Sequence, residues 1–179
     1  VLSKICIESG LHEGILNIVH GTGERTGDPL TTHPDTPIVS FTGGTATGKH
    51  IASVTAPMFK KVSLELGGKN PNIIFSDSDF DKAVSFASRA AFTNQGQICL
   101  CGSRIFIQED IYKKFKEALI SKASKLKVGD PKDTNTNLGA VVSEEHMNKI
   151  LSKIELSKQL GGKILLGGSR EILNGEFKD

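Results

Sequence analysis

A strand, a glycine-rich turn and a helix follow one another between residues 37 and 59, and this order narrows the folds available to the chain. Residues 37–41 form an apolar run typical of a buried parallel strand, residues 42–48 read Thr-Gly-Gly-Thr-Ala-Thr-Gly, and a helical pattern covers residues 49–59. This arrangement directs unpaired backbone N–H groups and the positive end of the helix dipole above the sheet, which suits a pyrophosphate. The spacing differs from Gly-x-Gly-x-x-Gly, so the residues alone leave a plain strand-to-helix turn equally open.

Strand and helix patterns alternate along the rest of the chain, which predicts the α/β class. Further strands are predicted at residues 14–19, 61–66, 72–75, 104–108 and 163–166. Helices are predicted at residues 1–9, 28–33 and 110–125, from an N-cap within 77–79 to about Asn94, and from the cap Ser143 to Leu160. The side chains expected to face inward are Ala83, Phe86, Ala87, Ala90 and Ala91 in one helix and Ile111, Phe115, Ala118 and Leu119 in another.

Cys99 is a candidate nucleophile, because it follows a glycine-punctuated polar segment where a helical pattern ends and a strand pattern begins. A cysteine thiolate is strongly nucleophilic and is accessible from an ordinary pKa of about 8.5. Cys6 lies in an apolar pattern and fits a small core residue. Cys101 neighbours the proposed nucleophile, but a buried structural thiol or an inert neighbour is favoured for it because only Cys99 occupies the motif position. Three cysteines with this spacing make a disulfide framework improbable, which favours a reducing compartment.

Glu65 is a candidate base, because it lies between Leu64 and Leu66 and directly precedes Gly67 and Gly68. Flanking leucines are expected to desolvate the carboxylate, and desolvation raises the pKa of a carboxyl group toward neutrality. A nucleophilic cysteine and a carboxylate base together suggest catalysis through a covalent thioester.

Two segments carry a family resemblance. Residues 64–71, Leu-Glu-Leu-Gly-Gly-Lys-Asn-Pro, resemble the glutamate signature of the NAD(P)-dependent aldehyde dehydrogenases, and residues 92–103 resemble their cysteine signature. The spacing of Glu65 and Cys99 resembles that of the hydrolytic members, and the likeness extends over essentially the whole chain. Within the family, the segments around these residues most resemble the 2-aminomuconic and 2-hydroxymuconic semialdehyde dehydrogenases.

The resemblance implies an aldehyde-dehydrogenase-like α/β fold, in which residues 1–66 are the C-terminal part of a Rossmann-like NAD-binding domain and residues 67–179 the N-terminal part of the catalytic domain. NAD is the expected cofactor, and the choice between NAD and NADP depends on positions upstream of this chain. Gly44 departs from the commoner family pattern, in which serine is frequent. The cofactor-binding residues that the resemblance implies are Gly23, Phe41, Gly43, Gly44, Thr47, Gly48, Leu66 and Gly67.

The resemblance also implies a mechanism in which Cys99 attacks the aldehyde and Glu65 activates water to hydrolyse the resulting thioester. In a CoA-acylating relative a thiol would replace this water, and Glu65 argues against that alternative. A catalytically silent homologue is a second alternative, against which the intact pair argues. A cysteine hydrolase would need a positioned histidine base, and nothing in the sequence selects one of the five histidines.

Composition bears on partners and location. The net charge of +2 is spread without a basic block, so neither nucleic acid nor a membrane surface is an expected partner, and the histidines and cysteines lack metal-ligand spacing. The expected partner is a small aldehyde substrate. The complete parent chain is expected to be a homo-oligomer and cytoplasmic. Because the chain opens at Val1 and ends in an unfinished pattern, it is expected to be a piece with little or no activity alone.

Overall fold

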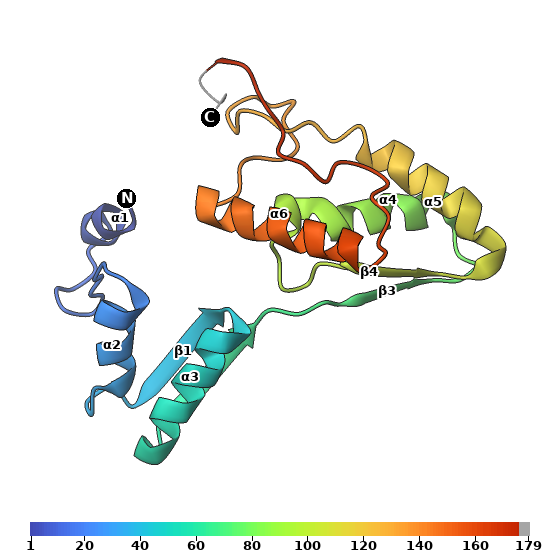
Figure 1. Cartoon of the computed structure of the whole chain (residues 1–179). Helices are drawn as coiled ribbons and strands as arrows, with labels where there is room; N and C mark the ends of the chain where they lie inside the picture. The colour runs from blue at the N-terminus through green and yellow to red at the C-terminus, as the bar shows by residue number, and fades with distance from the viewer. Residues whose placement is uncertain (176–179) are drawn as a thin grey trace. The chain divides into compact units, whose positions relative to one another are not determined.

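The computed structural model describes residues 1–175 and divides the chain into two compact units, Val1–Gly67 and Gly68–Asp179. Both are built on the same plan, a pair of parallel strands joined through a helix (Figure 1). This alternation of strands and helices is the pattern that the sequence predicts.

The first unit contains the β1–α3–β2 motif. Its elements are α1 (Leu2–Glu8), the single-turn π-helix η1 (Gly23–Gly27), α2 (Asp28–Thr32), β1 (Ile38–Gly43), α3 (Thr45–Thr55), the 3₁₀ turn η2 (Ala56–Met58) and β2 (Lys61–Leu66). The strands β1 and β2 are parallel, and the register pairs Ile38 with Lys61 and Gly43 with Leu66. The helix α3 packs on both strands and buries Ile51, while Val39 is buried in β1.

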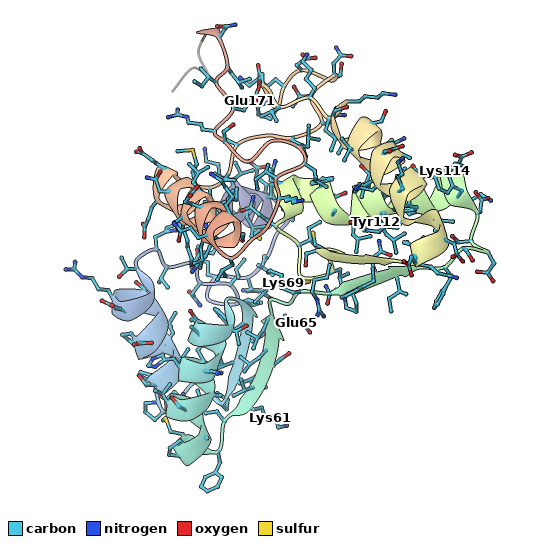
Figure 2. The ribbon with its side chains drawn as sticks, turned by 45° about the vertical axis from the view of Figure 1, so that its right-hand side comes forward. Lys61, Glu65, Lys69, Tyr112, Lys114 and Glu171 are labelled. Atoms are coloured by element: carbon cyan, nitrogen blue, oxygen red, sulfur yellow. The ribbon has the colours of Figure 1, made fainter. Side chains whose placement is uncertain are left out.

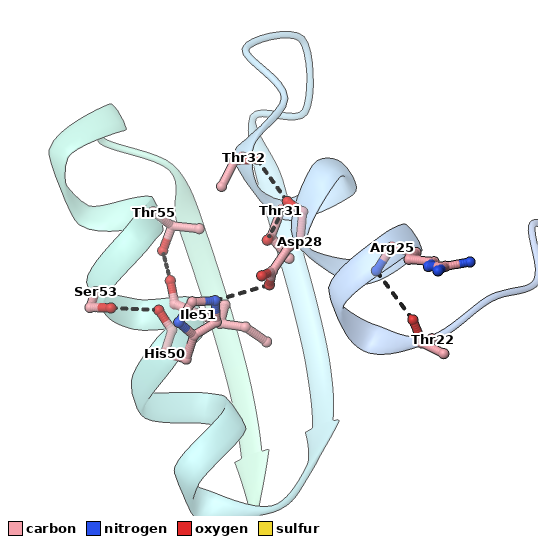
Figure 3. Close-up of polar contacts among 9 residues, drawn as sticks. All are labelled: Thr22, Arg25, Asp28, Thr31, Thr32, His50, Ile51, Ser53 and Thr55. Carbon is pink, nitrogen blue, oxygen red and sulfur yellow. Dashed lines mark hydrogen bonds and ion pairs between the residues drawn. The ribbon is translucent and has the colours of Figure 1, made fainter.

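Polar contacts hold α2 beside α3 (Figure 3). The His50 Nε2 atom lies 2.9 Å from Asp28 Oδ1, which joins the two helices, and the Asp28 carbonyl accepts hydrogen bonds from the hydroxyls of Thr31 and Thr32. The fully buried Thr55 donates its hydroxyl to the carbonyl of Ile51 at 2.6 Å. Burial of this hydroxyl is therefore compensated within its own helix.

The second unit contains the β3–α4–β4 motif. Its elements are β3 (Pro71–Ile74), α4 (Phe80–Phe92), the 3₁₀ segment η3 (Thr93–Gly96), β4 (Arg104–Ile107), α5 (Glu109–Ala123) and α6 (Glu144–Gln159). The strands are parallel, and the register pairs Pro71 with Arg104 and Ile74 with Ile107. The core joins Ile74, Val84 and Ala87 to Phe115 of α5, which is fully buried.

Two predicted N-caps are confirmed. Asp79 accepts a hydrogen bond from the backbone N–H of Lys82 and forms an ion pair with the Lys82 side chain at 2.8 Å. The hydroxyl oxygen of Ser143 accepts a hydrogen bond from the backbone N–H of His146. The Lys82 side chain first, and then the backbone hydrogen bonds, hold the pKa of Asp79 below its ordinary value. These caps satisfy amides at the helix starts, and the cap of α4 fixes the helix that leads to the cysteine segment.

Two predicted strands were wrong. Residues 14–19 and residues 163–166 are exposed and belong to no strand of the described chain. Gly14 has a left-handed φ of 81°, and its carbonyl accepts from the Asn17 side chain. A strand exists only where its backbone groups pair with a neighbour, and no part of residues 1–175 provides one for these two apolar runs.

Two predicted core positions were also wrong. Phe86 is 62% exposed, because it is two residues from Val84 and therefore lies on the opposite side of α4. Cys6 is only half-buried, and α1 buries none of its residues. The predicted inward face of α5, from Ile111 to Leu119, is confirmed.

Replacement of Phe115 by alanine should lower the free energy of unfolding by about 3–5 kcal/mol, because it leaves a cavity where the ring packs edge-on against Phe80. The measurement is urea denaturation followed by circular dichroism. The matched control Phe86→Ala removes an exposed ring from α4 and should change stability by no more than about 0.5 kcal/mol. Equal losses in both variants would contradict the assigned core.

Candidate active site

The parallel register of the first unit brings two predicted site segments to one edge. Thr42 of β1 pairs with Glu65 of β2, and Gly43 pairs with Leu66. Both strands end at this edge, which in an α/β sheet is where ligands bind. Figure 2 labels Lys61 at the start of β2 and Glu65 near its end. The predicted base and the glycine turn are thus neighbours in the fold, although they are separate in the sequence.

The start of α3 can receive an anion. The first amides of an α-helix have no acceptor within the helix. The N-cap of α3 is Gly44, which has an extended backbone and no side chain to cap these amides. The carbonyl of Gly44 accepts from the N–H of Gly48 at 3.0 Å, which starts the helical pattern. Thr47 is exposed in this first turn. Open amides and the helix dipole together favour a negatively charged group such as phosphate.

Two glycines at the ends of the predicted turn lie in close contact with neighbouring side chains. A Cβ atom on Gly48 would lie 2.5 Å from Cδ2 of Leu66, and one on Gly43 would lie 2.5 Å from Cζ of Phe41. Gly48 therefore lets α3 approach the end of β2, and Leu66 and Phe41 cover the base of the turn. By contrast, a Cβ on Gly44 would have no atom within 4 Å.

Gly23 and Gly67 stand apart from these contacts. Gly23 opens η1, which Thr22 caps by accepting from the N–H of Arg25, and it makes no hydrogen bond to the turn among the described residues. Gly67 follows the end of β2 and is the last residue of the first unit. Their roles toward a cofactor stay predictions.

Replacement of Gly48 by valine should destabilise the protein by about 1–3 kcal/mol, because the new side chain overlaps Leu66 and forces α3 or Leu66 to move. Thermal or urea unfolding measures the loss. The matched variant Gly44→Ser adds a side chain where there is open space and supplies an N-cap, so its stability should stay equal or rise by only about 0.3 kcal/mol. A Gly48→Val protein as stable as the wild type would contradict the close packing of α3 on β2.

Glu65 is exposed in the structure, which corrects the expectation that its two leucine neighbours desolvate it. The reason lies in strand geometry, since successive side chains of β2 point to opposite faces of the sheet. Leu64 and Leu66 therefore share one face, where both are half-buried, and Glu65 points to the other. An exposed carboxylate can reach water directly.

The second unit presents Cys99 on a tight turn. The turn is closed by a hydrogen bond from the N–H of Cys101 to the carbonyl of Ile98 at 3.0 Å. Cys99 is exposed, whereas Cys101 is 6% exposed, so the two nearby thiols differ sharply in access. The backbone N–H of Cys99 donates to no acceptor among the described residues. An exposed thiol beside a backbone N–H that has no acceptor is suited to attack on a carbonyl group.

Asn70 holds this turn, and the sequence reasoning did not single it out. Its side-chain Nδ2 donates to the carbonyl of Cys99 at 2.6 Å and to that of Cys101 at 3.2 Å. Its own carbonyl accepts from the N–H of Arg104 at 3.2 Å, and Arg104 Nε donates to the carbonyl of Lys69 at 2.8 Å. The only signal in the sequence is the position of Asn70 inside the glutamate motif.

The segment before the turn reverses the chain after α4. Asn94 and Gln95 have left-handed φ values of 50° and 56°, followed by Gly96 at 73°. Left-handed backbone is uncommon outside glycine, and asparagine is one of the residues that adopt it most readily. The N–H of Gly102 then bonds to the carbonyl of Ala90 at 3.0 Å, which ties the far end of the cysteine turn back to α4.

Glu65 lies in the first unit and Cys99 in the second. Among residues 1–175, no cluster of histidine, cysteine and acidic side chains has the form of a metal site. In the same part of the chain, none of the helices combines the length and apolar character needed to cross a membrane.

The sequence matches the aldehyde dehydrogenase family over residues 1–178. It is similar to 2-aminomuconic semialdehyde dehydrogenase of Danio rerio, with 44% identity over 167 residues that cover 93% of this chain and 34% of that protein. It is 45% identical over 169 residues to betaine aldehyde dehydrogenase 1 of Oryza sativa subsp. japonica, which covers 94% of this chain and 34% of that protein. The crystal structure of betaine aldehyde dehydrogenase from Staphylococcus aureus in complex with NAD+ matches with a TM-score of 0.92 and 42% identity, over 97% of this chain and 34% of that one.

The chain therefore belongs to the aldehyde dehydrogenase family. The resemblance carried by the glutamate and cysteine motifs is confirmed, as is the predicted α/β fold class. The chain spans about a third of the length of these relatives.

Proposed function

We propose that a protein containing this chain oxidises an aldehyde to a carboxylic acid with NAD+, using Cys99 as nucleophile and Glu65 as base. The observation that carries the proposal is the turn at Cys99. Of the three cysteines, only Cys99, which stands at the nucleophile's position in the family motif, is exposed, and its backbone N–H has no acceptor among the described residues. Family membership supplies the reaction class, and the turn supplies the nucleophile.

The first step assigned to the protein is attack on the aldehyde. The Cys99 thiolate forms a bond to the carbonyl carbon, and the carbonyl oxygen takes the electron pair as an oxyanion. The open N–H of Cys99 can donate to this oxyanion, since a donor fixed beside the nucleophile stabilises the charge as it develops. NAD+, when bound, supplies the acceptor for the hydride that leaves this carbon.

The second step assigned to the protein is hydrolysis. After loss of the hydride the acyl group stays on Cys99 as a thioester. Glu65 takes a proton from a water molecule, the water oxygen bonds to the acyl carbon, and the thiolate leaves. The exposure of Glu65 is compatible with this task, because the carboxylate must meet water.

The first unit fits the cofactor. The uncapped start of α3 offers open amides to a pyrophosphate, and Gly44 leaves room for close approach of its backbone. Phe41 and Leu66 line the neighbouring glycines. We assign cofactor binding to residues 1–66 and the nucleophile to the remainder. The related Staphylococcus aureus structure, which is in complex with NAD+, supports the choice of cofactor.

We further propose that the activity needs more chain than residues 1–179. The relatives are about three times as long. Large apolar side chains on the strands are exposed, among them Ile38, Ile73 and Phe106. Parallel sheets are normally covered on both faces, so these strands lack part of their expected cover in this chain.

The substrate class is tested by NADH formation. We expect the intact protein to oxidise 2-aminomuconic or 2-hydroxymuconic semialdehyde without CoA. Betaine aldehyde is the second candidate, because the 2-aminomuconic semialdehyde dehydrogenase and the betaine aldehyde dehydrogenase have nearly the same sequence identity to this chain, 44% and 45%. The isolated 179-residue chain should form no NADH. Turnover only with CoA would indicate the acylating class, and NAD+ binding without turnover of any aldehyde would indicate a silent homologue.

Replacement of Glu65 by glutamine should lower steady-state turnover by roughly 10²–10⁴-fold while keeping a single-turnover burst of NADH, because the amide cannot take a proton from water during hydrolysis. Stopped-flow absorbance of NADH separates the two phases. Cys99→Ser should abolish both phases, and Cys6→Ser, which alters a half-buried thiol in α1, should retain both. A Glu65→Gln enzyme with normal steady-state turnover would contradict the assigned base.

A further inference from the structure

We infer that Asn70 is a positioning residue for Cys99, which it holds through the backbone of the cysteine turn. The inference rests on the proposed function, since it assigns Asn70 a role in presenting the nucleophile. The Asn70 side chain carries two N–H donors, and the two carbonyl groups that it reaches belong to Cys99 and Cys101, on either side of Leu100.

The two hydrogen bonds fix the peptide groups around the nucleophile. The carbonyl of Cys99 belongs to the peptide that follows its Cα atom, so holding it restricts the rotation that would swing the thiol. The turn is also closed by the bond from the N–H of Cys101 to Ile98, and it is tied to α4 by the bond from the N–H of Gly102 to Ala90, but neither bond holds the carbonyl of Cys99. Asn70 connects the turn to a strand of the sheet.

Asn70 is itself firmly held. It is half-buried and directly precedes β3, and its backbone carbonyl accepts from the N–H of Arg104. The Arg104 side chain donates to the carbonyl of the preceding Lys69, which Figure 2 labels in the segment between β2 and β3. A site that depends on exact placement needs support of this kind, with the supporting side chain fixed by its own contacts. The last residues of the glutamate motif thus support the cysteine motif.

The matched control is Asn72, two residues further along the chain, in β3. It is also half-buried, and its Cβ would lie 3.2 Å from a Cβ built on Gly102, so it too neighbours the turn. Among the described residues, however, its side-chain amide makes no hydrogen bond. Alanine at position 70 or 72 therefore removes the same side-chain atoms at or just before β3, and only the change at position 70 removes hydrogen-bond donors from the turn.

The test combines hydrogen–deuterium exchange with steady-state kinetics on the intact protein. In Asn70→Ala, exchange of the amides in residues 98–104 should rise about tenfold, with other peptides unchanged, because the turn loses two hydrogen bonds. The value of kcat should fall roughly 10- to 100-fold, with KM for aldehyde and for NAD+ unchanged within about twofold, since binding is intact and the nucleophile is misplaced. Asn72→Ala should match the wild type in both measurements.

A second variant separates the loss of hydrogen-bond donors from the loss of side-chain packing. Asn70→Asp keeps the shape of the side chain and replaces the donors by oxygen atoms that face two carbonyls, so it should lower kcat at least as much as Asn70→Ala. Equal effects at positions 70 and 72, exchange that rises throughout the second unit, or a looser turn with normal kcat would each overturn the inference. If the intact protein oxidises no aldehyde, the proposed function fails, and the exchange comparison alone decides whether Asn70 holds the turn.

Discussion

Parallel pairing of β1 with β2 is the constraint on which the cofactor edge depends. The register places Leu66 beside Gly43, and from there the leucine side chain reaches Gly48 of α3. A slip of one residue would turn every side chain of β2 to the opposite face. Leu66 would then leave α3, and Glu65 would take its place against the helix. The register thus determines at once how α3 packs and where the carboxylate points.

The second unit uses the same motif but presents its chemistry at the other end of the strands. Glu65 lies at the end of β2, whereas the cysteine turn immediately precedes β4 and is tied to the residue before β3. Burial of Val84 and Ala87 against Phe115 fixes α4, and the chain that leaves α4 must turn back to enter β4. The left-handed backbone at Asn94 and Gln95 makes this reversal. Asn70 donates to the carbonyl of Cys99, which has no other donor among the described residues, and to that of Cys101, which also accepts from the N–H of Ser103.

Local signals predicted most of the elements. The bounds of β2 agree with the predicted residues 61–66, and the side-chain caps of α4 and α6 were predicted from the sequence, because a cap is decided by residues within one turn. The two wrong strands show the limit of the same reasoning. Apolar content indicates that a segment prefers burial, but a strand forms only beside a partner, and the partner is not encoded in the segment.

The sequence by itself determined the family, the alternation of strands and helices, the face of α5 that enters the core, and the identity of the proposed nucleophile and base, because each depends on residue type and short-range spacing. The exposure of Glu65, the contact of Gly48 with Leu66 and the hold of Asn70 on the turn at Cys99 are visible only in the folded chain. These features depend on strand register and on hydrogen bonds between residues far apart in the chain. Local pattern carries no information about which distant group will be the partner.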